Sequence, residues 1–373
     1  MTVYLDHAAT TPMRPEAVEA MLPHLAERFG NPSGSHAVAR EANKAVEEAR
    51  EVVAACLGAQ PGEVVFTGTG TEADNLAILG AHALRPGPVV STAIEHHAVL
   101  HACDSLNGRV APVTPSGVVD VDALADLLEP SVGVVSVMLV NNEVGTIQPL
   151  AQVAEVVRER APHAVLHTDA VQGVPWLDVA PLAAPADLVA VSAHKFGGPK
   201  GVGALVVREG VVLAPIIHGG GQERLRRSGT HNVAGIVAMA AALQGTVADR
   251  ERTVARVAAL RDRLADGLLA AVPDSHETGD RAVKVAGNCH LSFAGVESEA
   301  LLVLLDAAGI CASAGSACAS GALEPSHVVM AMGVPHDRAL GSLRLTLGPT
   351  TTEADVEAAL AAIPAAVERL RAG

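Results

Sequence analysis

Short, valine-rich apolar runs alternate with segments of helical periodicity through the middle of this chain, and that alternation limits the fold more than any other feature. Each run is apolar at almost every position, which is typical of strands buried on both faces of a sheet. Strands of this kind with helices between them predict an α/β protein whose mostly parallel mixed sheet is flanked by helices. The predicted strands are Glu63–Thr67, Pro88–Thr92, Val110–Val113, Gly133–Val140, Ala164–His167, Leu188–Ser192 and Gly203–Val207.

The pattern changes after about Asn232, where one long helix is predicted to run to about Leu269. The elements predicted beyond it form a smaller α+β lobe: strands His290–Phe293 and Ser342–Leu347, and helices Glu299–Ala308 and Glu353–Arg371. Ahead of the strands, helices are predicted over Arg14–Arg28 and His36–Leu57. We therefore expect a large domain over residues 14–250 and a small domain made of residues 1–13 and 251–373.

Composition bounds the class of protein. Of the 373 residues, 49% are hydrophobic and 18% are charged, which is typical of a globular chain. A formal net charge of -15 opposes binding to a phosphate backbone, so we expect no direct contact with nucleic acid. No run reaches the roughly 18 apolar residues of a membrane span, and the first residues do not resemble a secretory signal. The chain is therefore expected to be cytoplasmic, with a small-molecule substrate or a protein partner.

The five cysteines are odd in number and contain no C-x-x-C pair, which opposes both a disulfide framework and a structural zinc site. At least one of them is therefore a candidate reactive thiol. Cys318 lies among small residues in Ala314–Gly321, a setting that suits an accessible thiolate. Buried, inert cysteines are nevertheless the commoner case. Composition alone does not rank Cys318 against Cys311.

A lysine directly follows the predicted strand Leu188–Ser192, in the segment Ser192-Ala193-His194-Lys195-Phe196-Gly197-Gly198. A lysine at the carboxyl end of a strand can form a Schiff base with an aldehyde cofactor, although a lone lysine is more often a solvated loop residue. Asp169 lies just past the preceding predicted strand, where a carboxylate can pair with a pyridinium nitrogen or simply cap a helix. The two residues together favour the cofactor interpretation.

Two other strand ends carry polar turns. Phe66–Asn75 reads as a strand, a Gly/Thr turn and a helix start, where Thr71 and backbone N–H groups can bind phosphate. The Thr-x-x-Asp spacing from Thr71 to Asp74 also fits a plain helix cap. His96 follows another strand and can stack on a flat cofactor or move protons. The neighbouring His97 suggests a metal site, but no further ligands follow at a suitable spacing, so we expect no metal.

Motifs along nearly the whole chain fit one family. They include Tyr4-Leu5-Asp6-His7-Ala8-Ala9-Thr10-Thr11-Pro12, Val140-Asn141-Asn142-Glu143-Val144-Gly145, the Ser-x-His-Lys segment, His218-Gly219-Gly220-Gly221-Gln222-Glu223, Arg227-Ser228-Gly229-Thr230 and Ser316-Ala317-Cys318. With these motifs the chain resembles the cysteine desulfurases of the nitrogen-fixation and iron–sulfur-cluster type. Those are fold-type I pyridoxal-phosphate (PLP) enzymes of the class-V aminotransferase family. One departure is the turn Gly68-Thr69-Gly70-Thr71, where Ser-Gly-Ala-Thr is expected; it keeps Thr71.

The resemblance implies PLP as cofactor and a role for each matching residue. Lys195 would bind the cofactor covalently, Cys318 would carry the transferred sulfur, and His96 would stack on the ring as the third catalytic residue. Thr230 would reach the phosphate in the other subunit of a homodimer. The other cofactor ligands would be Gly70, Thr71, Asn142, Asp169, Gln172, Ser192 and His194, and the substrate carboxylate would bind Arg344 beside Asn142.

The implied reaction converts L-cysteine to L-alanine and leaves the sulfur as a persulfide on Cys318. The Gly-Ser-Ala-Cys segment resembles the branch of the family that hands sulfur directly to acceptor proteins. Iron–sulfur cluster assembly, tRNA thiolation and DNA sulfur modification all stay open as destinations. A transaminase or kynureninase-like hydrolase would share Lys195 and Asp169 without needing a cysteine. A selenocysteine lyase and a scaffold that only docks partners are further alternatives.

Overall fold

A computed structural model describes residues 2–315 and 324–372. Its largest element is a seven-stranded sheet in the order β2-β8-β7-β6-β5-β3-β4. β8 runs antiparallel to both of its neighbours, and the remaining neighbours pair in parallel. The mostly parallel mixed sheet expected from the sequence is confirmed. Its strands are β2 (Val64–Thr67), β3 (Val89–Thr92), β4 (Arg109–Ala111), β5 (Val134–Ser136), β6 (Val165–Asp169), β7 (Leu188–Ser192) and β8 (Gly203–Val207).

Helices cover both faces of this sheet because successive strand residues point to opposite sides. In β2, Val64 and Phe66 belong to one hydrophobic core, and Val65 belongs to the core on the other face. The first face is covered by α3 (Ala37–Cys56), α6 (Val121–Leu127), α7 (Leu150–Arg160), α8 (Val179–Leu182) and the first half of α9 (Val233–Ala271). The second face is covered by α4 (Gly70–Leu84) and α5 (His97–Asp104).

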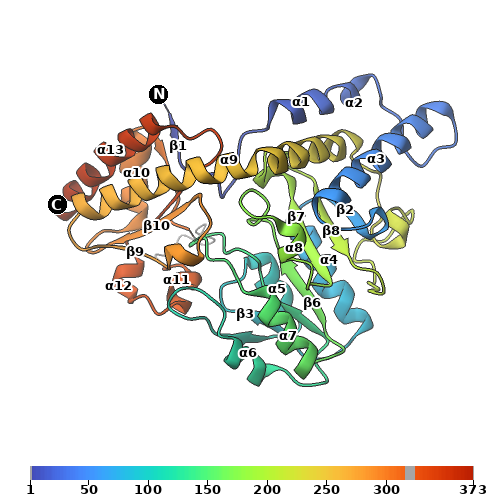
Figure 1. Ribbon diagram of the computed structural model, residues 1–373, viewed down its shortest axis with the longest axis horizontal. Helices are drawn as coiled ribbons and strands as arrows, with labels where there is room; N and C mark the ends of the chain where they lie inside the picture. The colour runs from blue at the N-terminus through green and yellow to red at the C-terminus, as the bar shows by residue number, and fades with distance from the viewer. Residues whose placement is uncertain (1, 316–323, 373) are drawn as a thin grey trace.

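The long helix α9 passes from the sheet into a second lobe (Figure 1). Its residues up to Leu243 pack in the first core, and those from Val257 onward pack in a separate core. The second lobe contains an antiparallel sheet in the order β12-β10-β9, and the amino-terminal strand β1 pairs with β11 beside it. Its elements are β1 (Val3–Tyr4), β9 (Ser275–Glu277), β10 (Asn288–Phe293), α10 (Ser298–Ala307), β11 (Ile310–Cys311), α11 (His327–Ala331), α12 (His336–Ala339), β12 (Ser342–Thr346) and α13 (Glu353–Ala372).

Two elements differ from prediction by more than one or two residues at an end. The helix expected over Arg14–Arg28 is divided into α1 (Pro15–Met21) and α2 (Pro23–Ala26), because Pro23 has no N–H to continue the first helix. The strand expected over Gly133–Val140 ends at Ser136, although Val137 and Leu139 still donate to backbone oxygens of β6. Within the described residues, no helix combines the length and apolarity needed to cross a membrane.

Candidate active site

A cavity of about 610 Å³ lies where the chain leaves the carboxyl ends of β2, β3, β6 and β7. Ligands of open α/β sheets bind at this edge. Residues of the second lobe, Asp6, Ser313 and Arg344 among them, close its other side. The cavity brings together most of the residues singled out in the sequence: Gly70, Thr71, His96, Asn142, Asp169, Gln172, Ser192, His194, Lys195 and Arg344. Thr230 is exposed and does not line this cavity, and Cys318 lies outside the described residues.

Lys195 ends a 3₁₀ turn (Ala193–Lys195) that follows β7. Its Nζ donates to the backbone oxygens of Ala8, at 2.6 Å, and Ala9, at 2.8 Å. Burial first, and then the positive charge of Arg344, lower the pKa of Lys195 to about 8, although the carboxylates of Asp169 and Asp6 act in the opposite direction. Lys195 is therefore a positioned amine whose neutral fraction near neutral pH is larger than that of a solvated loop lysine.

Asp169 is the last residue of β6 and is fully buried beneath the cavity. Its Oδ1 accepts from the N–H of Val171 at 2.9 Å. Burial raises the pKa of Asp169 to about 6, while the Val171 hydrogen bond and the charge of Lys195 hold it down, so the group is a carboxylate at neutral pH. A turn follows Asp169, not a helix, so the helix-cap interpretation is wrong. Nearby, Gln172 donates through Nε2 to Ala8 O at 2.8 Å.

The Gly/Thr turn fits a phosphate group. Thr69 caps α4 by accepting from the N–H of Glu72 at 3.0 Å, so the turn does cap a helix, but the cap is Thr69 and not the Thr-x-x-Asp arrangement that begins at Thr71. Thr71, one residue into the helix, has an exposed hydroxyl with no hydrogen-bond partner in the described chain. A Cβ added to Gly70 would lie 3.1 Å from Ser192 Cβ and from Val171 Cγ2, so a larger residue would push these neighbours away by a few tenths of an ångström. The helix start and Ser192 therefore form a small cradle for an anion.

The imidazoles at the cavity are neutral. His96 caps α5 and accepts from the Ala98 N–H through Nδ1 at 3.1 Å, which leaves the proton on Nε2. Burial and the nearby Lys195 charge lower the pKa of His96 to about 4. Burial and the same charge lower the pKa of His194 to about 4. The ring centroids of His97 and His327 lie 4.8 Å apart, beside His96. Among the described residues, however, no group of three or more His, Cys, Asp or Glu side chains could hold a metal ion.

Arg344, in β12, has one side-chain nitrogen without a hydrogen-bond partner among the described residues. Its Nη2 donates to Asp6 Oδ1 at 2.8 Å and its Nη1 donates to Asn142 O at 3.1 Å. The Nε atom is buried without a partner in the described part of the chain. A buried guanidinium N–H without a partner, in a side chain that lines a cavity, is costly unless a ligand accepts from it. A carboxylate is the group that suits it.

The residues on either side of the Cys318 segment also lie at the cavity. Gly315 precedes the segment and His327 follows it, and both line the cavity, whereas Cys311 does not. Ser326 hydrogen-bonds to the buried carboxyl of Glu143, the residue after Asn142. The sequence analysis gives no role to Glu143, although its motif contains the residue, and it misses the Lys195 contacts to Ala8 and Ala9, because these contacts join residues far apart in the sequence.

Two other cysteines are unsuited to nucleophilic chemistry. Burial raises the pKa values of Cys103 and Cys289 to about 12, so their thiols stay protonated at neutral pH. Burial also raises the pKa of Cys56, which lies on α3 away from the cavity. Among the described cysteines, Cys311 alone remains as a rival to Cys318.

Comparison with known proteins gives the class of this chain. Residues 3–359 match the model of the family described as Aminotransferase class-V, and the chain belongs to that family. Fold-type I architecture and PLP as cofactor follow from this membership and are confirmed.

Curated relatives and solved structures show which members of that family this chain resembles. The chain is 44% identical to "Cysteine desulfurase IscS" of Methanosarcina thermophila, over 99% of this chain and 93% of the relative. It is 48% identical to "IscS-like cysteine desulfurase" of Mycobacterium tuberculosis, over 99% and 97%. A solved "NIFS-LIKE PROTEIN" superposes with a TM-score of 0.92 at 35% identity, covering 99% of this chain and 100% of that one.

Proposed function

We propose that this protein is a PLP-dependent cysteine desulfurase, a sulfurtransferase that converts L-cysteine to L-alanine and passes the sulfur on through a persulfide on Cys318. The observation that carries the proposal is a single cavity containing Lys195, the Asp169 carboxylate and the unpaired Nε of Arg344. Named cysteine desulfurases that match this chain over almost their full length support the same activity.

The chain's own residues fit the cofactor. Lys195 would attach it covalently, Asp169 would pair with its pyridine nitrogen, and Gln172 would bond its phenolic oxygen. Neutral His96 would stack on the ring and can donate through Nε2. The phosphate would be bound by the Gly70 backbone together with the side chains of Thr71, Ser192 and His194. When bound, PLP supplies an electron sink for the bond-breaking steps.

Substrate binding and proton transfer then follow from three residues. Arg344 would take the substrate carboxylate, with Asn142 between that carboxylate and the cofactor. Once displaced by the substrate amine, Lys195 would remove the α-proton at Nζ, which its lowered pKa of about 8 allows near neutral pH.

The sulfur-transfer step balances without an added oxidant. The Cys318 thiolate attacks the substrate sulfur, an S–S bond forms, and the substrate C–S bond breaks with its electron pair going to the carbon fragment. Protonation of that fragment gives alanine. L-cysteine and one thiol thus become L-alanine and one persulfide.

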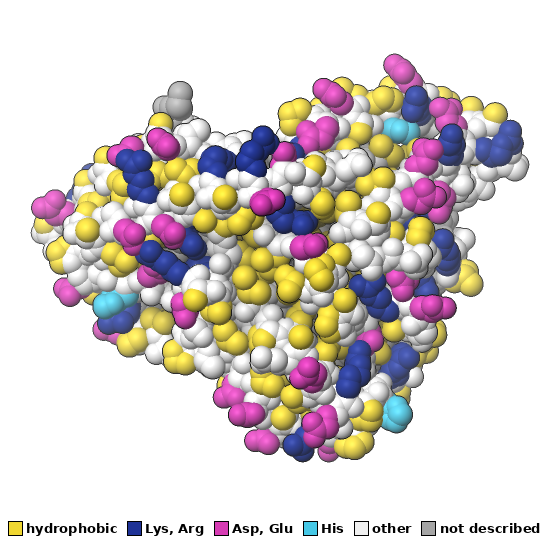
Figure 2. Space-filling model, in the orientation of Figure 1, with side chains coloured by type: hydrophobic (Ala, Val, Ile, Leu, Met, Phe, Trp, Pro, Cys, Tyr) yellow, Lys and Arg dark blue, Asp and Glu magenta, His cyan; other side chains and the backbone are white. Residues whose placement is uncertain are grey.

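The proposal includes a homodimer, an acceptor protein and a cytoplasmic location. Exposed Thr230 would complete the phosphate site of the other subunit. The persulfide would serve iron–sulfur cluster assembly or a thiolation enzyme. On the face seen in Figure 2, Lys and Arg side chains are scattered among Asp and Glu, which together with the net charge of -15 supports a protein acceptor over direct nucleic acid binding.

The test compares three variants with L-cysteine as substrate. Cys318→Ala is expected to retain bound cofactor and lose at least about 99% of alanine formation, whereas Cys311→Ala stays close to the unchanged protein. Lys195→Ala is expected to lose both covalent cofactor and turnover. A transaminase or hydrolase would keep its turnover in Cys318→Ala, and that result would reject the desulfurase.

A further inference from the structure

The loop that carries Thr230 contains an unusual backbone. Three consecutive residues other than glycine adopt left-handed φ values: Glu223 at 48°, Arg224 at 57° and Leu225 at 67°. Side chains with a Cβ disfavour this region, and such residues persist only where surrounding contacts impose them. Strain of this kind concentrates at functional sites. This stretch lies outside the cavity of its own chain.

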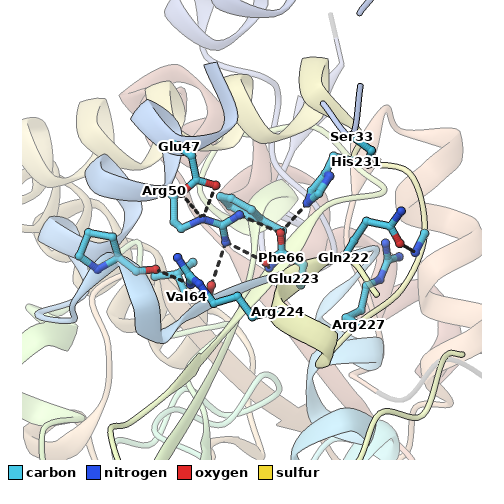
Figure 3. Close-up of polar contacts among 12 residues, drawn as sticks. Ser33, Glu47, Arg50, Val64, Phe66, Gln222, Glu223, Arg224, Arg227 and His231 are labelled. Atoms are coloured by element: carbon cyan, nitrogen blue, oxygen red, sulfur yellow. Dashed lines mark hydrogen bonds and ion pairs between the residues drawn. The ribbon is translucent and has the colours of Figure 1, made fainter. Parts of the chain in front are cut away.

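The contacts that impose the turn converge on the buried carboxylate of Glu223 (Figure 3). Arg50, on α3, donates from Nη1 at 2.7 Å and from Nη2 at 2.8 Å, one bond to each carboxylate oxygen. The backbone N–H of Phe66, in β2, donates at 2.8 Å, and His231 Nε2 lies 2.6 Å away. Although burial opposes ionisation, the hydrogen bonds from Arg50 and His231 lower the pKa of Glu223 to about 2.

These contacts attach both ends of the loop to rigid elements. Arg50 is itself buried, donates to Val64 O at 2.9 Å and lies over the Phe66 ring at 4.7 Å. At the far end, His231 directly follows Thr230. Gln222 accepts from the Gly229 N–H at 2.8 Å, which closes the loop on itself. These contacts hold the loop in one conformation. Its exposed residue Thr230 does not line the cavity of its own chain.

We propose that Glu223 and Arg50 are positioning residues that act in trans: they fix Thr230 in the conformation in which it binds the cofactor phosphate of the partner subunit. This rests on the homodimer in the proposed function, but not on the fate of the substrate sulfur. A buried ion pair that only stabilises its own chain is the competing explanation. When the Glu223–Arg50 pair is broken in one subunit, the first explanation predicts weaker PLP binding in the partner subunit, and the second predicts it in the same subunit.

Glu223→Gln keeps the shape of the side chain and removes its charge, so it weakens the bonds from Arg50 and His231. In the homodimer it is expected to reduce PLP affinity at least about tenfold. Glu47→Gln is the matched control, because Glu47 also accepts from Arg50, at 3.2 Å, but is half-exposed and does not touch the loop. That variant is expected to bind PLP normally.

Heterodimers distinguish the explanations. Two chains with different tags are co-expressed, one of them carrying Lys195→Ala, so that only the other chain attaches PLP covalently. Borohydride makes that link permanent, and the intact mass of the Lys195-bearing chain, measured across a PLP titration, reports affinity without any turnover. In one heterodimer Glu223→Gln is placed on the Lys195-bearing chain; in the other it is placed on the Lys195→Ala chain.

The proposal predicts near-normal PLP affinity in the first heterodimer and at least about a tenfold loss in the second, because only there is the donated loop damaged. The reverse pattern, equal effects in both, or a monomeric wild-type protein would overturn it. If Glu223→Gln does not fold, Glu223→Gln/Arg224→Gly replaces it, since glycine accepts the left-handed φ without strain. A chain that captures PLP in this pattern but makes no alanine would reject the desulfurase and leave this inference standing.

Discussion

At the scale of single residues, charge placement sets the chemistry of the cavity. Lys195 lies near two carboxylates and one guanidinium, and its pKa of about 8 reflects burial first and then the positive charge of Arg344, which the carboxylates of Asp169 and Asp6 oppose. Only the neutral amine can attack an aldehyde, so Arg344 prepares Lys195 for cofactor attachment in addition to binding substrate.

Arg344→Gln should therefore slow PLP capture by the apoprotein at pH 7. Removing the guanidinium charge raises the pKa of Lys195, which leaves less neutral amine; each unit of increase costs about tenfold in rate. Stopped-flow absorbance across pH 6 to 10 measures the effect, and the midpoint of the rate profile should move to higher pH. Arg369→Gln, an exposed residue, serves as control. An unchanged midpoint would contradict this account of Lys195.

A second residue-scale prediction concerns Glu95, which precedes His96 and is fully buried. Burial raises the pKa of Glu95 to about 8, and one of its oxygens has no partner among the described residues. Because the native pKa lies above the unfolded value of 4.5, Glu95 favours the folded state most at low pH, and that contribution is lost as pH rises from 4.5 through 8.

In Glu95→Gln the folded state does not lose stability in this way as pH rises, because the amide does not ionise. Its oxygen can still accept from the Thr92 hydroxyl and the Met138 N–H. The Tm of the variant apoprotein, relative to the unchanged protein, should rise by on the order of a few degrees between pH 5 and pH 8.5. Differential scanning calorimetry measures it, with exposed Glu368→Gln as control. A Tm difference that does not vary with pH would show that Glu95 does not titrate in this range.

At the scale of elements, the site depends on how closely α4 approaches β7. Gly70 lets the two elements approach without crowding, since an added Cβ would meet Ser192 and Val171 at 3.1 Å. Gly70→Ala is expected to move the start of α4 and weaken PLP binding at least about tenfold, with little effect on apoprotein Tm because alanine suits a helix. Gly62→Ala, where the new Cβ would meet only Arg224 at 4.0 Å, is the matched control. A fluorescence titration measures the PLP affinity of both variants. Equal affinities would mean that Gly70 is not part of the phosphate cradle.

The same scale shows what the sequence predicts and what it does not. Valine-rich runs locate all seven strands of the large sheet, and the strand ends locate Lys195 and Asp169, because those signals are local. The bonds from Lys195 to Ala8 and Ala9, and the bond of Glu143 to Ser326, join residues more than a hundred positions apart. Such pairs depend on how the two lobes pack. The sequence does not indicate the left-handed turn at Glu223–Leu225 either, because the turn contains no glycine to mark it.

At the scale of the whole molecule, α9 connects two hydrophobic cores, one ending at Leu243 and the other beginning at Val257. We propose that these cores correspond to a large domain over residues 14–250 and a small domain of residues 1–13 and 251–373. The cavity lies between them, so PLP should protect both from hydrogen exchange. Protection confined to one lobe would contradict that arrangement.

The proposed homodimer makes a separate prediction. Leu225, 73% exposed in the Thr230 loop, is expected to contact the partner, and Leu225→Asp should raise the dimer dissociation constant at least about tenfold. Light scattering across a dilution series should give twice 37.9 kDa for the unchanged protein. Leu182→Asp, on α8, is the control at another exposed leucine. A Leu225→Asp dimer as tight as the control would remove this loop from the interface.

The central claim is that sulfur moves from L-cysteine to Cys318, and a single-turnover experiment tests it most directly. The PLP-loaded protein is mixed with less than one equivalent of sulfur-34-labelled L-cysteine, quenched with an alkylating reagent and digested. The account predicts one labelled sulfur on the peptide containing Cys318, in amounts equal to the alanine formed, and none on the peptide containing Cys311. Alanine formed without labelled Cys318, or label on Cys311 instead, would contradict it.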